Sequence, residues 1–194
     1  MSPRVAYGFT SKPTEVHSVD LWPGNPKSLP KAPTVLQYSD RTHFKWGYEV
    51  DGASTDKIIG VKLLLDPDMK RPLFDTAGAA ESKAQIAKLG KPPVDIASDY
   101  MSAMYQHAMK HIAGKFPNGY LDTMDKQFVL SVPAVWSDKA KDTTEKVWFV
   151  DACPKLCILT LVGCSQCWHF SCGIDQGTRG SGTIHARVLE ESGT

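Results

Sequence analysis

The chain has 194 residues, of which 42% are hydrophobic and 22% are charged, as in an ordinary globular protein with a buried core. Its 22 basic and 21 acidic residues leave a formal net charge of +1, so charge gives no reason to expect a nucleic acid or a membrane surface as a partner. No apolar run reaches the roughly 18 residues of a membrane-spanning helix, and MSPRVAYGFTSKP lacks the apolar core of a signal peptide, so we expect a cytoplasmic protein.

The first fifty residues predict four strands. Residues 5–10 and 15–21 read as a hairpin, because SKPT between them supplies turn residues in a four-residue loop. Residues 21–33 hold four prolines and a glycine and predict a loop. Residues 34–39 and 43–50 predict two further strands, the second because its aromatic residues occupy alternate positions: Phe44, Trp46 and Tyr48.

Two helical patterns follow, separated by a polar region. DKIIGVKLLLDP, residues 56–67, predicts a short helix with Pro67 beyond its end. Residues 68–93 are polar, rich in alanine and interrupted by glycine and proline, which indicates a variable surface insertion. Residues 92–119 predict a long helix, since apolar residues recur there at spacings of three and four: Val94, Ala97, Met101, Met104, Tyr105, Ala108 and Ile112.

The stretch FVLSVPAVWSDKAKD, residues 128–142, joins a strand pattern to a helix pattern. Residues 126–132 predict a strand that Pro133 ends, because proline has no N–H to donate to a sheet. Ser137 or Asp138 is then placed to cap a helix over residues 138–150. Four strands, two helices, a strand and a helix in this order predict a layered α/β domain.

This stretch resembles the strand–Val-Pro-Ala–helix element of the heat shock protein 70 family, within the actin-like ATPase superfamily. Tryptophan after Val-Pro-Ala-Val is similar to the divergent, fungal-type members. Five more stretches agree with the family in the same order: VAYGFTSKPTEVHSVDLWPGN, KAPTVLQY, KWGYEV, VKLLLDP and KPPVDIASDYMSAMYQHAM. The resemblance covers roughly residues 5–147 and implies an incomplete ribonuclease-H-like, actin-like ATPase lobe over residues 1–152, a mixed sheet with flanking helices.

The resemblance also implies a chemistry. Members of the family are molecular chaperones that hold ATP or ADP with Mg²⁺ between two such lobes and act on unfolded protein clients. Lys62 matches the catalytic lysine, whose charge would stabilise the transferred phosphate. Pro133 and Lys141 match the proline and the basic residue of the switch between domains. Judged by the residues alone, Pro133 is equally a plain strand end and Lys62 equally a surface lysine, while a solvated helix face is the better interpretation of Lys141.

The sequence departs from the family pattern at both ends. Only four residues precede VAYGF, where the family has a strand and an Asp-x-Gly-Thr-Thr phosphate loop, and the acidic segment and second phosphate loop are not found after Val147. We therefore expect a truncated ATPase domain, a fragment inactive by itself, with an exposed sheet edge where the first strand would lie. Asp175, Gly177 and Thr178 form an Asp-x-Gly-Thr, a weak candidate for binding nucleotide.

Residues 153–194 differ in composition from the rest. All five cysteines lie between Cys153 and Cys172. An odd number in one cluster is a poor disulfide framework, so we predict an irregular, Cys-rich tail that is disordered or an aberrant reading of the gene. Cys164 and Cys167 form a C-x-x-C pair with His169 close behind, but the remaining ligands are crowded against this pair, and no metal site is predicted.

His107 and His111 lie one helical turn apart, as paired metal ligands do. No glutamate follows His107 as in a H-E-x-x-H site, so helix-surface histidines are the better interpretation. Two further functions stay open beside the truncated ATPase: a degenerate, non-enzymatic interaction module that pairs through a sheet edge, and a zinc-binding tail on an inactive lobe.

Overall fold

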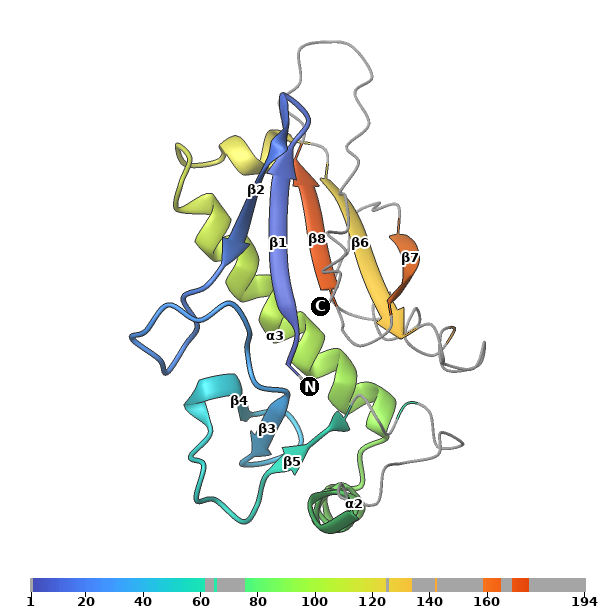
Figure 1. Cartoon of the computed structure of the whole chain (residues 1–194). Helices are drawn as coiled ribbons and strands as arrows, with labels where there is room; N and C mark the ends of the chain where they lie inside the picture. The colour runs from blue at the N-terminus through green and yellow to red at the C-terminus, as the bar shows by residue number, and fades with distance from the viewer. Residues whose placement is uncertain are drawn as a thin grey trace, which may run out of the picture.

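A computed structural model describes residues 2–61, 65, 76–124, 126–133, 142, 159–164 and 169–174. These residues form a five-stranded sheet, a three-stranded sheet and two α-helices (Figure 1), so the protein is of the α/β class, as predicted. No described helix combines the length and the apolar character that crossing a bilayer requires.

The larger sheet is mixed and has the strand order β2-β1-β8-β6-β7. Strand β1 pairs antiparallel with β2 and parallel with β8, while β6 pairs antiparallel with β8 and parallel with β7. Segments far apart in the sequence thus lie side by side (Figure 1). The bounds of its strands are β1 Arg4–Phe9, β2 Lys12–Val19, β6 Lys126–Pro133, β7 Leu159–Cys164 and β8 His169–Ile174.

The hairpin of β1 and β2 is confirmed, but its predicted four-residue loop is wrong. Strand β2 already begins at Lys12 and so includes Pro13. Proline is tolerated there because β2 is an edge strand and needs no N–H on its open side. Val5 and Tyr7 alternate toward the core on β1, and both are almost completely buried.

The smaller sheet is antiparallel, with the order β4-β3-β5: β3 Val35–Tyr38, β4 Phe44–Trp46 and β5 Ile58–Ile59. Strand β4 is shorter than expected, because Gly47 takes a φ of 60° and the chain turns into the 3-10 helix η1, Gly47–Glu49. The helix predicted over residues 56–67 is wrong at β5, where two β-branched residues pair with β3. Residues 62–64 and 66–75 lie outside the described residues.

Helix α2, Thr76–Leu89, lies within residues 68–93, where a variable surface insertion was predicted. Its alanines favour a helix intrinsically. The helix ends at Gly90, which has a φ of 63° and whose N–H donates to the carbonyl of Ile86 at 3.0 Å. The sequence pattern did not predict a helix here, because propensity and a glycine cap, not a clear apolar stripe, determine it.

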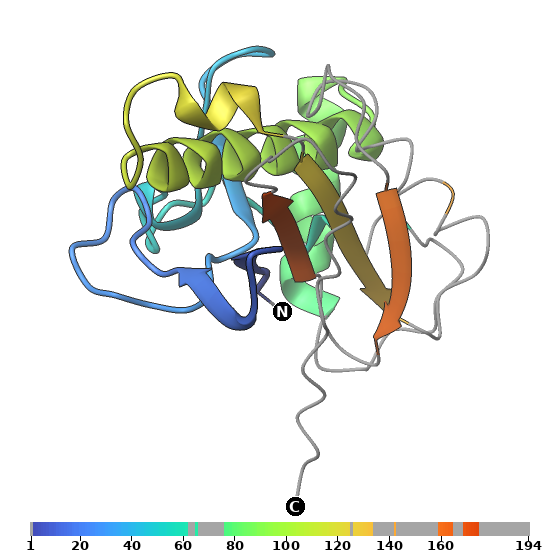
Figure 2. The same cartoon turned by 90° about the horizontal axis from the view of Figure 1, so that it is seen from above.

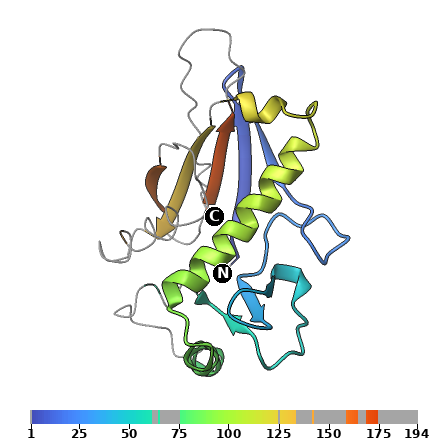
Figure 3. The ribbon, with the colours of Figure 1, turned by 180° about the vertical axis from the view of Figure 1, so that it is seen from behind.

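Helix α3, Pro93–Ala113, confirms the long-helix prediction and carries the core. It runs along one face of the larger sheet (Figures 2 and 3) and continues toward the smaller one. Tyr100 is fully buried, packs edge-on against Trp46 and donates its hydroxyl to the Pro33 carbonyl at 3.1 Å. The buried residues of α3 are Ile96, Ala97, Ser98, Tyr100, Met101, Met104, Ala108 and Ile112.

The sequence predicts an irregular tail for the region that contains β7 and β8. At residues 159–164 and 169–174 this prediction is wrong, because the structure has strands there. β8 lies between β1 and β6, so β1 has a neighbour on both sides, and the expected free edge there is not present. Whether residues 153–194 form a separate unit stays a prediction. The helix predicted over residues 138–150 lies outside the described residues, apart from Asp142, which is helical.

Candidate functional site

Of the site residues predicted from the sequence, the structure describes Pro133. Lys62, Lys141, Asp175, Gly177 and Thr178 lie outside the described residues. Pro133 is the last residue of β6, opposite Cys164 at the end of the parallel strand β7. On its other side, β8 pairs with β6 only from Lys126 to Leu130. Pro133 therefore ends the strand, as predicted.

The candidate loop at residues 175–178 follows Ile174 directly. Ile174 pairs with Lys126, at the start of β6, whereas Pro133 lies at its end. Seven residues of extended strand separate these positions, about 23 Å. The structure thus does not bring the end of β8 near Pro133, because β8 runs antiparallel to β6.

The strand register also bears on a zinc site in the cysteine cluster. Cys164 lies opposite Pro133 on one side of β6, and Cys172 lies opposite Phe128 on the other. Their positions are about 16 Å apart along β6, whereas each sulfur of a zinc site lies about 2.3 Å from the ion. These two cysteines therefore cannot share one zinc in this arrangement, and within the described residues no group of three metal-ligating side chains is found.

His107 is held by the loop after β2. His107 is half-buried, lies 2.6 Å through Nε2 from the carbonyl oxygen of Leu21, and packs against Trp22. Burial, and then the charge of Lys115, lower the pKa of His111. His107 is thus a packing residue that anchors the loop after β2, rather than a free surface histidine.

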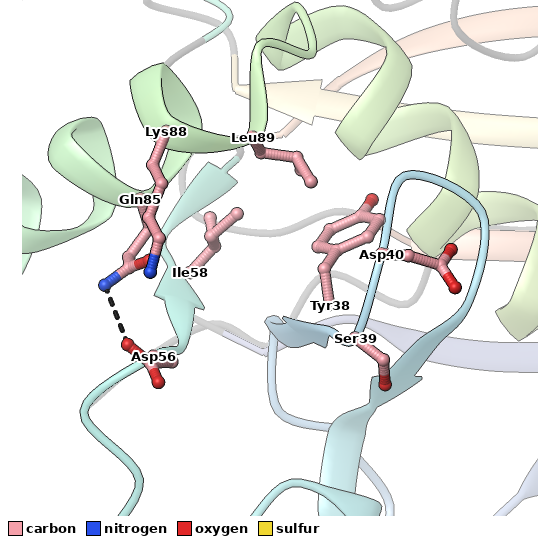
Figure 4. A pocket seen from close by; sticks show the side chains of 8 residues that line it. All are labelled: Tyr38, Ser39, Asp40, Asp56, Ile58, Gln85, Lys88 and Leu89. Carbon is pink, nitrogen blue, oxygen red and sulfur yellow. Dashed lines mark hydrogen bonds between the residues drawn. The ribbon is translucent and has the colours of Figure 1, made fainter.

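A pocket of about 330 Å³ lies between the smaller sheet and α2 (Figure 4). Gln85 and Lys88 extend from α2 toward Asp56, while Ile58, Leu89 and Tyr38 form its apolar part. Gln85 donates Nε2–H to Oδ1 of Asp56 at 3.1 Å. The residues that line the pocket are Tyr38, Ser39, Asp40, Asp56, Ile58, Gln85, Lys88 and Leu89.

The wall of this pocket is held by a cluster around Asp99 of α3. The Tyr38 hydroxyl donates to Oδ2 of Asp99 at 2.5 Å, and Lys91 forms a partly buried ion pair with the same oxygen. The Lys91 ammonium also lies 5.4 Å from the centre of the Tyr38 ring. Burial, and then the Asp99 carboxylate, raise the pKa of Tyr38 well above its ordinary value. The phenol therefore stays neutral and acts as a donor, not as a base or a nucleophile.

The turn after β3 is organised by Asp40. Its carboxylate accepts from the backbone N–H groups of Thr42 and His43, at 2.7 and 2.8 Å, and from the Thr42 hydroxyl. These hydrogen bonds, the one from the His43 N–H foremost, hold the pKa of Asp40 far below its ordinary value. Next to it, Arg41 donates to the carbonyls of Leu89 and Gly90, which fixes the turn to the end of α2.

Replacing Asp40 by asparagine should remove a stabilising effect that depends on pH. Because the pKa of Asp40 is lowered by folding, its contribution is complete above the unfolded pKa of about 3.9 and is lost as the pH falls toward the folded pKa. We expect wild type to be more stable than Asp40→Asn at pH 7 and the difference to shrink below about pH 4. Urea unfolding of both proteins at pH 7, 5 and 3 measures this, and a difference that grows at pH 3 would contradict it.

The pocket combines charged and apolar groups, but its geometry supports binding rather than catalysis. Tyr38 and Asp99 are engaged with each other, and Asp40 is engaged by its own turn. Sequence reasoning missed the pocket because its lining residues come from the regions of β3, β5 and α2, which are distant in the chain. The one available signal was the Asp-Arg-Thr-His sequence at residues 40–43, which is typical of a turn closed by an aspartate side chain.

A scan against protein-family models gives no match to the chain, and a search of curated proteins gives none either.

Proposed function

We propose that the chain is a lobe of a nucleotide-binding domain of the heat shock protein 70 type, without ATPase activity by itself. The observation that supports this most is the strand β6, which ends at Pro133 where the family resemblance of residues 128–144 expects the strand to end. The hairpin of β1 and β2 and the long helix α3 occur in the order that the resemblance implies. The lobe is proposed to be cytoplasmic, with unfolded protein chains as clients of the assembled chaperone.

In this proposal the chain contributes part of a site for ATP or ADP with Mg²⁺. Lys62 would lie against the phosphates as a compact positive charge. Pro133 and Lys141 would couple the end of the sheet to the following helix and so respond to the nucleotide. A lobe of this kind supplies only some of the phosphate contacts, each of which is worth several kcal/mol in a complete site.

Hydrolysis of ATP by this chain is therefore expected at background. Phosphate release from MgATP should be the same with and without the protein, and Lys62→Ala should leave it unchanged. Release at about 1 s⁻¹ or faster, typical of working enzymes, and abolished by Lys62→Ala would contradict the inactive state of the lobe.

Nucleotide binding tests the lobe assignment itself. In an amide NMR titration with MgADP, we expect weak binding, with chemical-shift changes concentrated at Ser131 and Val132, next to Pro133, and around Lys62. MgCl₂ alone and AMP are the controls for the metal and for the adenosine part. Saturation without changes at these two places, or no change at millimolar nucleotide, would reject the assignment.

Interaction through a sheet edge is less well supported. Strand β2 is at the edge, and its Val16 is 53% exposed. The same strand, however, carries Lys12, Pro13 and Glu15, residue types that disfavour pairing with another strand.

A further inference from the structure

The pocket between β5 and α2 carries two opposite charges that are not paired with each other. Asp56 is exposed, and its described hydrogen bond from Gln85 uses only Oδ1. Lys88 is one helical turn from Gln85. Among the described residues, Lys88 forms no ion pair. Both side chains reach the same end of the pocket (Figure 4). Oδ2 of Asp56 and the ammonium of Lys88 are therefore the groups with which this end can bind a ligand.

The other end of the pocket is apolar. Ile58 is 2% exposed, and the side chains of Leu89 and Tyr38 lie next to it in the pocket lining. The Tyr38 hydroxyl is already engaged with Asp99, so Tyr38 offers mainly its ring to a ligand. This end would take an aliphatic or aromatic group.

Three other charged residues near the pocket are already engaged with the protein, so they add no free charge to it. Asp40 points away from the interior in Figure 4, and its oxygens are engaged by Thr42 and His43. Arg41 is engaged by the carbonyls of Leu89 and Gly90, and Lys91 is paired with Asp99. Among the residues that the structure describes, Asp56 and Lys88 remain as the charges that a ligand would meet.

We propose that this pocket binds a small zwitterion with an apolar body, of the class of a free aliphatic or aromatic amino acid. Its ammonium would meet Oδ2 of Asp56, its carboxylate would meet Lys88, and its side chain would lie on Ile58 and Leu89. A ligand with only one charge would lose one of these two attractions. This binding site is independent of the proposed nucleotide site.

The size of the pocket limits the ligand and its affinity. At about 330 Å³ it lies at the small end of ligand pockets, which hold about 300–1,000 Å³. An amino acid fits this volume better than a dinucleotide does. Because Asp56 and Lys88 are both exposed, we expect a dissociation constant of about 1 mM.

Ligands that lack one charge test the proposal on the full-length wild-type chain. In an amide NMR titration, L-leucine should shift the signals of residues 39–40, 56–58 and 85–89. L-Leucinamide, which lacks the carboxylate, and N-acetyl-L-leucine, which lacks the ammonium, should each bind about tenfold more weakly, about 1.4 kcal/mol. No shifts up to 20 mM leucine (about 20 times the expected constant), or equal binding of all three ligands, would overturn the proposal.

Two variants test which charge of the ligand contacts Lys88 and which contacts Asp56. Lys88→Met should weaken leucine about tenfold and leave leucinamide unchanged, while Asp56→Asn, which can keep the contact with Gln85, should weaken leucine and leave N-acetyl-leucine unchanged. Lys83→Met is the matched control, because Lys83 is exposed on α2 and does not line the pocket. An equal effect of Lys83→Met and Lys88→Met would also overturn the proposal, since the effect would then be one of net charge.

Discussion

Gly24→Ala is expected to destabilise the protein by about 3 kcal/mol or more, the largest effect we predict for adding a single methyl group. Gly24 has a φ of 78°, where an L-residue costs about 1–2 kcal/mol. A Cβ at this position would also lie 2.7 Å from the backbone N of Glu49 and from the backbone C and O of Tyr48. Backbone cannot move aside as a flexible side chain can, so the loop after β2 would have to separate from η1.

Gly119 is a matched control for this prediction. Its φ of 79° is almost the same, but no atom lies within 4 Å of the position of an added Cβ. Gly119→Ala should therefore cost only the conformational part, about 1 kcal/mol. Urea unfolding followed by tryptophan fluorescence measures both variants, and equal losses would show that the contact of Gly24 with η1 is not tight.

This contact illustrates which part of the fold the sequence predicts. The prolines and the glycine of residues 21–33 predict a loop correctly, because turn residues act locally. That Gly24 touches Tyr48 and Glu49 could not be predicted, since the contact joins residues some twenty-five positions apart. The same holds for His107, whose Nε2 lies 2.6 Å from the Leu21 carbonyl oxygen and ties the loop to α3.

The two helices also show that local patterns can be predicted from the sequence and contacts between distant residues cannot. The apolar spacing of α3 predicts both the helix and its buried face, including Met101, Met104 and Ile112. Helix α2 has no comparable stripe. It is attached instead by Ser82, whose fully buried hydroxyl donates to the Gly78 carbonyl and accepts the N–H of Ile59 at 3.0 Å. A single serine that joins a helix to β5 leaves no periodic signal in the sequence.

Of the two candidate sites, one could be predicted from local sequence and the other could not. Pro133 could be predicted because a proline after an apolar run ends a strand by local chemistry alone. The pocket could not, because Asp56, Ile58 and Lys88 meet only after β5 pairs with β3 and α2 packs beside it. The order of strands in the larger sheet could not be predicted either, since β8 begins 36 positions after the end of β6.

Phe128→Cys is expected to form a disulfide with Cys172 almost completely, in a chain whose other four cysteines are serines. Residues 128 and 172 are direct partners in the antiparallel pairing of β6 with β8. The Cα atoms of such partners lie about 4.5–5.5 Å apart, within the range of about 4.4–6.8 Å that a disulfide accepts. Mild oxidation followed by peptide mapping of the monomer should therefore find this bond within one chain.

Ser131→Cys is the matched control in the same background. Ser131 lies three residues further along β6, about 10 Å from the position opposite Cys172, which exceeds the limit of about 7 Å for a disulfide. If β8 occupies its place between β1 and β6, only Phe128→Cys reacts, and residues 169–174 are part of the sheet. If both variants react to the same extent, residues 169–174 sample many positions, and the prediction of an irregular tail from residue 153 onward is favoured instead. The pairing of β8 thus decides whether residues 169–174 belong to the larger sheet or whether the folded unit ends before them.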